Sequence, residues 1–392
     1  MPSAPPPAWI EVDLDAVAAN HALLTGLMRQ HNPAAVVGGV IKADGYGLGA
    51  AGLAPALAAA GAPALFVAHL AEGAAVRHAL TAAGHITPVY ILNGITAGEV
   101  ADALAFDLRP VLNSSADLAC WTRQSAAAGR PLPAALHIDT GMNRLGFDEH
   151  DLTRLIDDPS VLDGVDIRLT MSHLACADQP DHPLNRAQRD RFRAAAAIVG
   201  RGRLSLANSS GLFLGPGWGF DLGRPGLALY GANPVPGRPN PMRPVVTLKA
   251  RLLQVRTVDS FESVGYGAAA RARPGMRVAT LAAGYADGWP WSTGGRGHVV
   301  IAGHAAPIVG RVSMDLLTVD VTALPDTLAH AGAVAELIGA HRDIDQLADE
   351  AGTISYDVLT RLGRRYARRL TGSAAGMSAD AAAPLTEVDR TP

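Results

Sequence analysis

The sequence contains very little lysine. Of its 33 lysine and arginine residues only Lys42 and Lys249 are lysines. Lysine can lose its proton when it is buried and then attack a carbonyl, whereas arginine stays charged. Lys42 follows the apolar run 36–41 and precedes a glycine-rich turn, so it stands at the end of an expected buried strand. Lys42 is therefore the first candidate for a residue that forms a Schiff base.

Other features that the sequence lacks exclude several classes of protein. Two cysteines, Cys120 and Cys176, are too few for a disulfide framework and have no metal-type spacing around them. A net charge of -3 gives no electrostatic footprint for nucleic acid. Residues 1–8 show no signal-peptide pattern, and no charge-free apolar run is long enough to span a membrane. We expect a cytoplasmic protein with no metal site, no nucleic-acid partner and no membrane partner.

Apolar runs alternate with alanine-rich stretches over the first 230 or so residues. The runs are short and continuous, as in parallel strands that are covered on both faces. Eight strands are expected at 36–42, 64–69, 88–92, 108–113, 134–139, 166–173, 204–208 and 227–230. Between them, helical patterns occupy 71–83, 115–128 and 186–199. This alternation predicts an α/β fold, a (β/α)8 TIM-like barrel over residues 9–236, with a doubly wound sheet as the competing topology.

A proline-rich segment at 233–239 marks a linker to a second domain. Beyond it the expected strands lengthen and lose their intervening helices, which predicts a mostly antiparallel β domain over residues 240–370. These strands are 245–258, 277–284, 298–303, 306–321 and 333–338, and helices are expected at 343–350 and 356–370. The tail, 371–392, is rich in alanine, serine, aspartate and proline and is expected to be disordered.

In a barrel of this kind, functional residues lie at the carboxyl ends of the strands. Lys42, His137, His173 and Asn208 all stand at such ends. Backbone amides and hydroxyls around residues 208–211 and 226–227 have the character of a phosphate site, which barrels often form after strands seven and eight. A phosphate site combined with a Schiff-base lysine indicates pyridoxal 5'-phosphate, the cofactor that joins an aldehyde to a phosphate.

Eight ordered motifs carry a resemblance to a known family. The first is VIKADGYGLG at 40–49, which resembles the cofactor-attachment motif of the bacterial alanine racemases, enzymes of PLP fold type III. The others follow in the family's order: HIDTGMNRLG at 137–146, SHLA at 172–175, ANSS at 207–210, RPGLALYG at 224–231, GYGA at 265–268, GYADG at 284–288 and VGRVSMD at 309–315. The resemblance covers nearly the whole chain.

The resemblance implies a role for each matching residue. Lys42 would carry pyridoxal phosphate and act as one catalytic base, and Tyr266 of a second subunit would act as the other. The cofactor would be bound by Lys42, Tyr46, Arg144, His173, Asn208, Ser209, Arg224, Gly226, Leu227 and Tyr356. The substrate would be bound by Arg144, Tyr285, Met314 and Asp315, with Asp178 and Arg311 near the entrance. The family also implies a homodimer with active sites shared between subunits, L- and D-alanine as substrates, and supply of D-alanine for peptidoglycan.

Alternative functions and one departure from the family pattern remain. A racemase of the same fold could act on serine or another small amino acid. A PLP-fold decarboxylase would present a carboxy-terminal cysteine site, and a non-catalytic PLP-binding protein would resemble the barrel alone. Many family members carry a carbamylated lysine where this chain has His137, and with only two lysines that carbamate cannot form here. An anion or Asn143 is expected to orient Arg144 instead.

Overall fold

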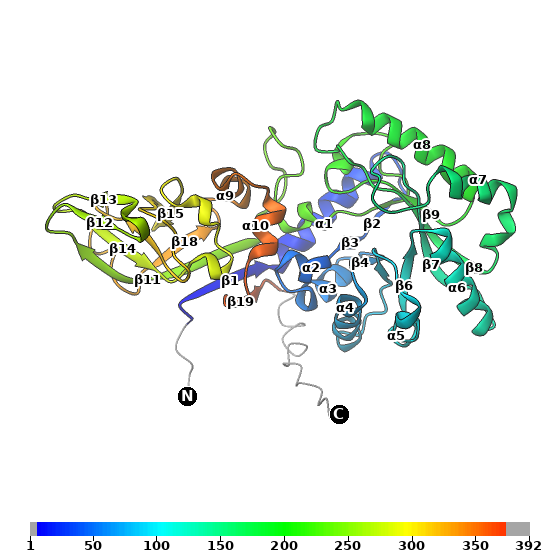
Figure 1. The fold of residues 1–392 in the computed structure, drawn as a ribbon, viewed down its shortest axis with the longest axis horizontal. Helices are drawn as coiled ribbons and strands as arrows, with labels where there is room; N and C mark the ends of the chain where they lie inside the picture. Colours follow the sequence, from blue (N-terminus) through cyan, green and yellow to red (C-terminus); the bar gives the residue numbers. More distant parts are fainter. Residues whose placement is uncertain (1–5, 374–392) are drawn as a thin grey trace, which may run out of the picture.

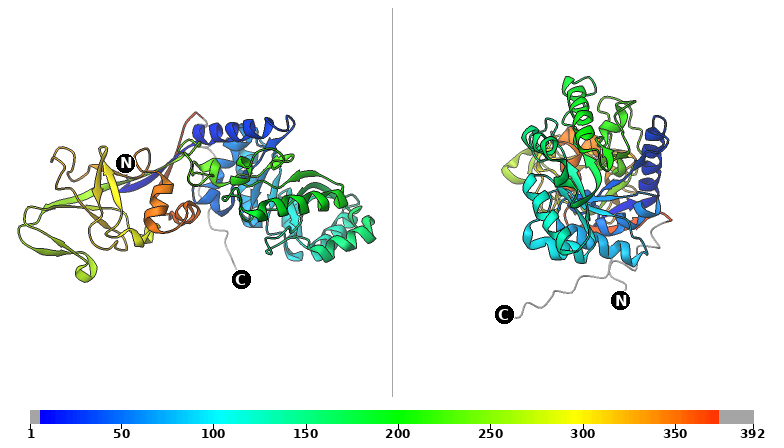
Figure 2. Two further views of the ribbon diagram at one scale, coloured as in Figure 1. Left: turned by 90° about the horizontal axis from the view of Figure 1, so that it is seen from above. Right: turned by 90° about the vertical axis from the view of Figure 1, so that its right-hand side faces the viewer.

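The structure is a computed structural model, and it describes residues 6–373 of the chain. A parallel β barrel and a mostly antiparallel β domain lie end to end along the long axis (Figures 1 and 2). The tail that was expected to be disordered is 371–392, and its residues 374–392 lie outside the described part. Its first residues are ordered: Thr371 ends a strand, and the Ser373 amide donates to the Asp15 carboxylate at 2.9 Å.

The barrel is built from parallel strands in chain order. Strands β3 to β9 form one sheet, and β10 pairs with β2, which immediately precedes β3. Their bounds are β2 Val36–Val37, β3 Gly39–Val40, β4 Leu65–Val67, β5 Val89–Ile91, β6 Leu108–Leu112, β7 Leu132–His137, β8 Val165–Met171, β9 Arg203–Ser205 and β10 Leu222–Gly223. The segment around β10 closes the barrel, because Val36 N donates to Asp221 O at 3.0 Å and Arg224 N donates to Ala207 O at 2.9 Å. The barrel prediction is confirmed and the doubly wound alternative is excluded.

The eighth strand was predicted at the wrong place. Residues 227–230 form the 3-10 helix η4, Leu227–Tyr230, and the eighth strand is β10. All four residues of η4 are buried. An apolar run that is buried on every side has no periodicity with which to tell a helix from a strand.

Helices cover the outside of the barrel (Figure 1). They are α1 Leu14–Arg29, α3 Ala50–Ala59, α4 Leu70–Ala82, α5 Val100–Ala105, α6 Ser115–Ala127, α7 Glu149–Asp157 and α8 Pro183–Val199. Polar side chains cap several of them: Asp13 accepts from the Ala16 amide and Ser114 from the Asp117 amide. Such caps satisfy backbone donors that have no partner inside the helix. The single turn α2, Lys42–Tyr46, lies between β3 and α3.

The β domain includes both ends of the described chain. Strand β1, Ala8–Asp13, pairs antiparallel with β11, Val246–Thr257, and parallel with β19, Ala367–Thr371. The other strands are β12 Glu262–Val264, β13 Ala270–Ala272, β14 Arg277–Leu281, β15 His298–Ile301, β16 His304–Pro307, β17 Leu317–Asp320 and β18 Val334–Ile338. The predicted boundary at residue 9 therefore placed β1 in the wrong domain.

Two helices, α9 Ile344–Ala351 and α10 Ser355–Arg361, lie in the β domain toward the barrel (Figure 1). The helix expected at 356–370 ends early, and its second half is β19. In β19 the side chain of Arg368 is half-buried. Its guanidinium donates to the backbone carbonyls of Gly47 and Leu362, at 2.6 and 2.9 Å from Nη2. These bonds tie β19 to the turn that follows Lys42.

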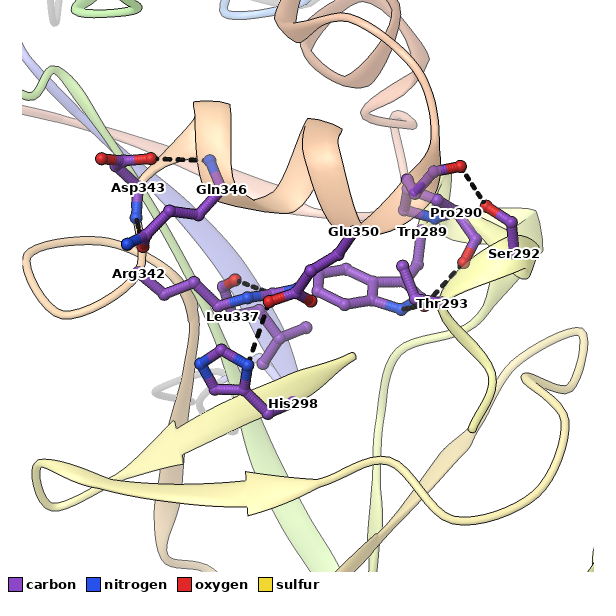
Figure 3. A network of polar contacts seen from close by, with 11 residues as sticks. Trp289, Pro290, Ser292, Thr293, His298, Leu337, Arg342, Asp343, Gln346 and Glu350 are labelled. Carbon is purple, nitrogen blue, oxygen red and sulfur yellow. Dashed lines mark hydrogen bonds and ion pairs between the residues drawn. The ribbon is translucent and has the colours of Figure 1, made fainter. Parts of the chain in front are cut away.

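A buried charged network joins α9 to β18 and to the turn η7, Trp291–Thr293 (Figure 3). The Arg342 side chain is fully buried and donates to the Glu350 carboxylate and, at 2.8 Å, to Leu337 O. The other oxygen of Glu350 lies 3.0 Å from Nδ1 of His298. The Arg342 guanidinium also lies 5.3 Å from the centre of the Trp289 ring. Because Trp289 lines a hollow with Tyr285, the network supports the wall of that hollow.

Candidate active site

Lys42 directly follows β3 and begins a left-handed backbone turn. Ala43 and Asp44 both have φ of 53°, and Tyr46 has φ of 57°. Non-glycine residues in this conformation cost about 1–2 kcal/mol each, so surrounding contacts must hold the turn. Asp44 Oδ1 accepts from the Ala50 amide at 2.8 Å inside the segment. The strained turn therefore lowers the free energy of unfolding, and it fixes the position of the Lys42 side chain at the end of β3.

The amine of Lys42 is half-buried, and its surroundings favour the neutral form. Burial lowers the pKa of Lys42, the positive charge of Arg144 lowers it further, and Glu72 opposes both. A lysine with a lowered pKa is available as a nucleophile and as a proton acceptor. Burial and Arg144 thus shift Lys42 toward the neutral amine that a Schiff-base role needs, and that role stays a prediction.

His137 is held in a defined tautomer by Asn113. The amide nitrogen of Asn113 donates to Leu92 O at 3.2 Å and to Val111 O at 3.1 Å, so its oxygen faces His137. That oxygen lies 2.8 Å from His137 Nδ1, and this distance assigns the proton to Nδ1. Burial, then the charge of Arg224, lowers the pKa of His137 to about 4. His137 is therefore neutral at pH 7 and presents Nε2 as an acceptor.

Arg144 lies close to three site residues. Its charge lowers the pKa of Lys42, of His137 and of His173. Burial is the largest cause for His173, whose pKa lies well below the usual histidine value. The loop before Arg144 is shaped by Asp139, whose Oδ1 accepts from the Gly141 amide at 2.8 Å. This loop presents an exposed guanidinium beside neutral imidazoles, which suits it to bind an anionic group.

Asn143 does not hold Arg144 in the described part of the chain. Its side chain is exposed, and no hydrogen bond joins it to another residue between 6 and 373. The backbone of Asn143 has φ of 55°, a left-handed conformation that asparagine tolerates better than most residues. The structure thus gives no support to the expectation that Asn143 orients Arg144, and an anion in that role stays a prediction. His137 offers a protein acceptor for the same task.

Two short helices begin side by side at the expected phosphate site. Helix η3, Ser210–Phe213, follows Ser209, and η4 follows Gly226. Ser209 Oγ accepts from the Gly226 amide at 3.1 Å and from the Ala228 amide at 3.2 Å. A Cβ atom on Gly226 would stand only 2.1 Å from the Tyr46 hydroxyl. Converging helix N-termini and a hydroxyl suit a phosphate dianion, so these residues are the expected cradle for the phosphate.

Arg224 is buried next to this cradle. Its guanidinium donates to Ser205 Oγ and to the backbone oxygen of Ser172. Burial lowers its pKa to about 9, which leaves the guanidinium charged at neutral pH. Its charge in turn lowers the pKa of both His137 and His173. Arg224 is thus a fixed cation among neutral imidazoles.

Tyr356 reaches the site from helix α10. Its ring centre lies 6.0 Å from that of Tyr46, whose ring centre lies 4.9 Å from that of Tyr230. Burial raises the pKa of Tyr356, and the negative charge of Asp178 raises it further. The Tyr230 hydroxyl donates to Val40 O at 2.7 Å and so ties η4 to the strand that carries Lys42. The β domain therefore contributes a hydroxyl to a site that otherwise belongs to the barrel.

The remaining predicted residues lie elsewhere in the chain. Tyr266 is 71% exposed in the turn between β12 and β13, far from α2 (Figure 1). Tyr285 and Met314 lie on two turns joined by bonds from Tyr285 N to Ser313 O at 3.0 Å and from Ala286 N to Met314 O at 2.9 Å. Asp315 pairs with Arg365 at 2.7 Å. In the described residues, no hydrogen bond, ring contact or charge effect joins these four predicted residues to Lys42.

One chain thus brings together some of the predicted residues and not others. Those assembled around the end of β3 are Lys42, Tyr46, Arg144, His173, Asn208, Ser209, Arg224, Gly226, Leu227 and Tyr356. Glu72 and Asn113 are two further residues near the site, and neither was predicted from the sequence. Glu72 stands at the third position of a helix and Asn113 at a strand end, and both patterns were available in the sequence. No group of three or more metal-ligating side chains is placed to hold a metal ion anywhere in residues 6–373.

These features fit pyridoxal phosphate, and they define the chain as an enzyme of the class that carries this cofactor on a barrel lysine. The sequence profile of the alanine racemase N-terminal domain matches residues 12–234, and that of the C-terminal domain matches residues 245–370. The chain belongs to the alanine racemase family, whose members are PLP-dependent isomerases.

Individual relatives of this chain are also alanine racemases. An alanine racemase of Rhodospirillum rubrum is 50% identical over 365 residues, which are 93% of this chain and 96% of the relative. A protein of Mesorhizobium japonicum named alanine racemase, catabolic, is 44% identical over 372 residues, 93% of each chain. The crystal structure of the Bartonella henselae alanine racemase, described with covalently bound pyridoxal phosphate, superposes with a TM-score of 0.86. It is 35% identical and covers 94% of this chain and all of its own.

Proposed function

We propose that this chain interconverts L- and D-alanine by a two-base reaction in a head-to-tail homodimer. Lys42 serves one face of the substrate, and the partner subunit's Tyr266 serves the other. The observation that carries the proposal is the position of Tyr266, which is exposed in the turn between β12 and β13; these strands lie far from α2, which begins with Lys42 (Figure 1). A catalytic tyrosine in that position can reach a lysine only in a second subunit.

The cofactor's contribution is electronic: pyridoxal phosphate, when bound, withdraws electrons from the α-carbon of an amino acid and so makes the α-proton removable. Lys42 would carry it covalently. The phosphate would be held by Asn208, Ser209, Gly226, Leu227 and Tyr356. Arg224 stays charged, and we assign it to the pyridine nitrogen. Tyr46 would pack beside the cofactor, since its hydroxyl already borders the cradle at Gly226.

Proton transfer on two faces requires two bases. Lys42 Nζ, with its pKa lowered by burial and by Arg144, loses its proton more readily than an ordinary lysine and so suits a base. The phenolic oxygen of the partner subunit's Tyr266 would donate or accept on the opposite face. Arg144 would bind the substrate carboxylate together with Met314 and Asp315, and Tyr285 would line the approach with Asp178 and Arg311. The Tyr285 and Met314 turns are hydrogen-bonded to each other, which supports assigning them to one surface.

Chiral chromatography with alanine, serine and other small amino acids tests the reaction and the substrate together. We expect alanine to be racemised fastest. Exchange of the α-proton with deuterated water tests the two bases, since Tyr266→Phe should slow exchange from one enantiomer far more than from the other. Equal losses for L- and D-alanine would contradict the assignment. We also infer supply of D-alanine for peptidoglycan and a place in the cytoplasm, which a gene-deletion strain and cell fractionation would test.

Across residues 6–373, every helix is too short or too polar to cross a bilayer.

A further inference from the structure

The turn that carries Lys42 is held from outside by one acidic side chain. Oε1 of Glu72 accepts from the Ala43 amide at 2.7 Å, immediately after Lys42. Oε2 of the same carboxylate accepts from the Ala68 amide at 2.7 Å and from the His69 amide at 3.3 Å, at the start of helix α4. One carboxylate therefore links the end of β3 to the beginning of the next barrel helix.

Neighbouring helices show that capping alone does not require this arrangement. Glu99 holds the equivalent position before α5, and its Oε2 accepts from both the amide and the hydroxyl of Thr96 at 2.8 Å. Asp117 at the start of α6 accepts from the Asn113 amide at 2.8 Å. Both bonds stay within their own strand-to-helix loop. Of these three capping carboxylates, only that of Glu72 also binds the adjacent barrel unit.

The contact matters because of the conformation at Ala43. Ala43 is the first of the left-handed residues, and such a backbone persists only where its surroundings fix it. The Ala43 amide has the Glu72 carboxylate as its partner. At the other end of the turn, Arg368 Nε donates to Gly47 O at 2.9 Å. The turn is therefore fixed at both ends by side chains of other elements.

The charge of Glu72 also faces Lys42. Two ionised groups act on the Lys42 amine: Arg144, which favours loss of its proton, and Glu72, which opposes that loss. His173 also lies near Lys42, but it is neutral because burial and the charge of Arg224 lower its pKa. Glu72 is thus the acidic side chain whose charge partly opposes the effects of burial and Arg144 on Lys42.

We propose that Glu72 is a positioning residue for Lys42, which fixes the left-handed turn through Ala43 and supplies the negative charge that faces the lysine amine. Glutamine at position 72 would remove the negative charge. Its side chain has only one oxygen, so either the Ala43 amide or the Ala68 amide would face an NH2 group instead of an acceptor. Aspartate would keep the charge but is one methylene shorter. The inference rests on the proposed role of Lys42 as cofactor anchor.

The chain offers an unusually clean measurement of this effect, because it has only two lysines. Protein labelled with 13C-lysine and freed of cofactor should give one side-chain signal from Lys42 and one from Lys249, which pairs with Glu11 at 2.8 Å. We expect Glu72→Gln to move the titration midpoint of Lys42 to lower pH and to leave that of Lys249 unchanged. Glu99→Gln, which removes a comparable cap, should move neither.

Cofactor retention gives a second readout on the loaded enzyme. We expect Glu72→Gln to release pyridoxal phosphate roughly tenfold faster or more, the usual effect of losing a hydrogen bond to a charged group. Glu72→Asp should also speed release but keep the Lys42 midpoint near that of the wild type. An equal Lys42 midpoint in Glu72→Gln and Glu99→Gln would overturn the proposal. Covalent attachment of the cofactor to Lys42→Ala would instead overturn the proposed function on which it rests.

Discussion

The Tyr46 hydroxyl lies 2.1 Å from the position that a Cβ atom would occupy on Gly226. Tyr46 is buried against Tyr230, so its ring has little freedom to move aside. The left-handed turn after Lys42 and the phosphate cradle at η4 are therefore in direct contact. A change on one side of this contact must displace the other.

Gly226→Ala tests this contact. The added methyl group must push Tyr46 or the amide of residue 226 out of place, and overpacking of this kind costs about 1–3 kcal/mol. We expect affinity for pyridoxal phosphate to fall about tenfold or more, measured by equilibrium titration of the protein freed of cofactor. Gly26→Ala, in a helix with nothing within 4 Å of the new Cβ, should leave affinity unchanged. Equal affinity of the two variants would show that the contact does not shape the cradle.

His137 should make stability depend on pH in the acidic range. Its pKa is lowered to about 4 in the folded protein, so the unfolded chain binds the extra proton first as the pH falls. The stabilising effect of keeping His137 neutral is present above about pH 6.5 and is lost as the pH falls toward 4. Between pH 7 and pH 5 the protonation of His137 in the unfolded chain lowers the free energy of unfolding by about 2 kcal/mol. Urea unfolding at both pH values measures this dependence.

The variant His137→Gln isolates the effect. Between pH 7 and pH 5 it should lose less free energy of unfolding than the wild type, by about 2 kcal/mol. His304→Gln, which changes an exposed histidine on β16, should behave like the wild type. A pH dependence unaltered by His137→Gln would mean that His137 is not held neutral by burial and the nearby arginines.

The buried pair of Arg342 and Glu350 should matter for stability (Figure 3). Arg342→Met leaves the Glu350 carboxylate without its main partner; because Glu350 is 22% exposed and keeps His298, the cost should lie near or below the lower end of the about 3–5 kcal/mol for a fully buried pair. Chemical denaturation should show this loss. Arg168→Met removes the exposed pair with Asp166 and should cost about 1 kcal/mol or less. Similar values for the two variants would show that the network does not stabilise the β domain.

Much of the barrel could be predicted from the sequence, because its strands are continuous apolar runs between helical patterns. Strand β10 could not, since two residues, Leu222–Gly223, carry no period. The arginine-rich segment 361–369 was read as a helix, but Arg368 turns inward to backbone carbonyls of the turn after Lys42. The sequence does not show that this turn lies beside β19, because the two segments are far apart in the chain.

Some residues of the candidate site could be proposed from the sequence, and others could not. The rarity of Lys42 and the position of Asn208 at a strand end were enough to propose both residues from the sequence. Asn113 and Glu72 were not, because their roles depend on contacts between successive barrel units. Asn113 reaches His137 on the next strand, and Glu72 reaches Ala43 in the turn that follows β3. Sequence spacing predicts that Glu72 caps its own helix. It does not show which neighbouring turn the second oxygen of the Glu72 carboxylate binds.

The most direct test of the central claim mixes two inactive chains. Lys42→Ala and Tyr266→Phe are each expected to be inactive or severely impaired as pure proteins. A mixed dimer would contain one site with both Lys42 and the partner subunit's Tyr266 intact. Random association should therefore restore about a quarter of the wild-type alanine racemisation, as measured by chiral chromatography. Mixed protein that forms dimers of both chains yet regains no activity would contradict a site shared between subunits.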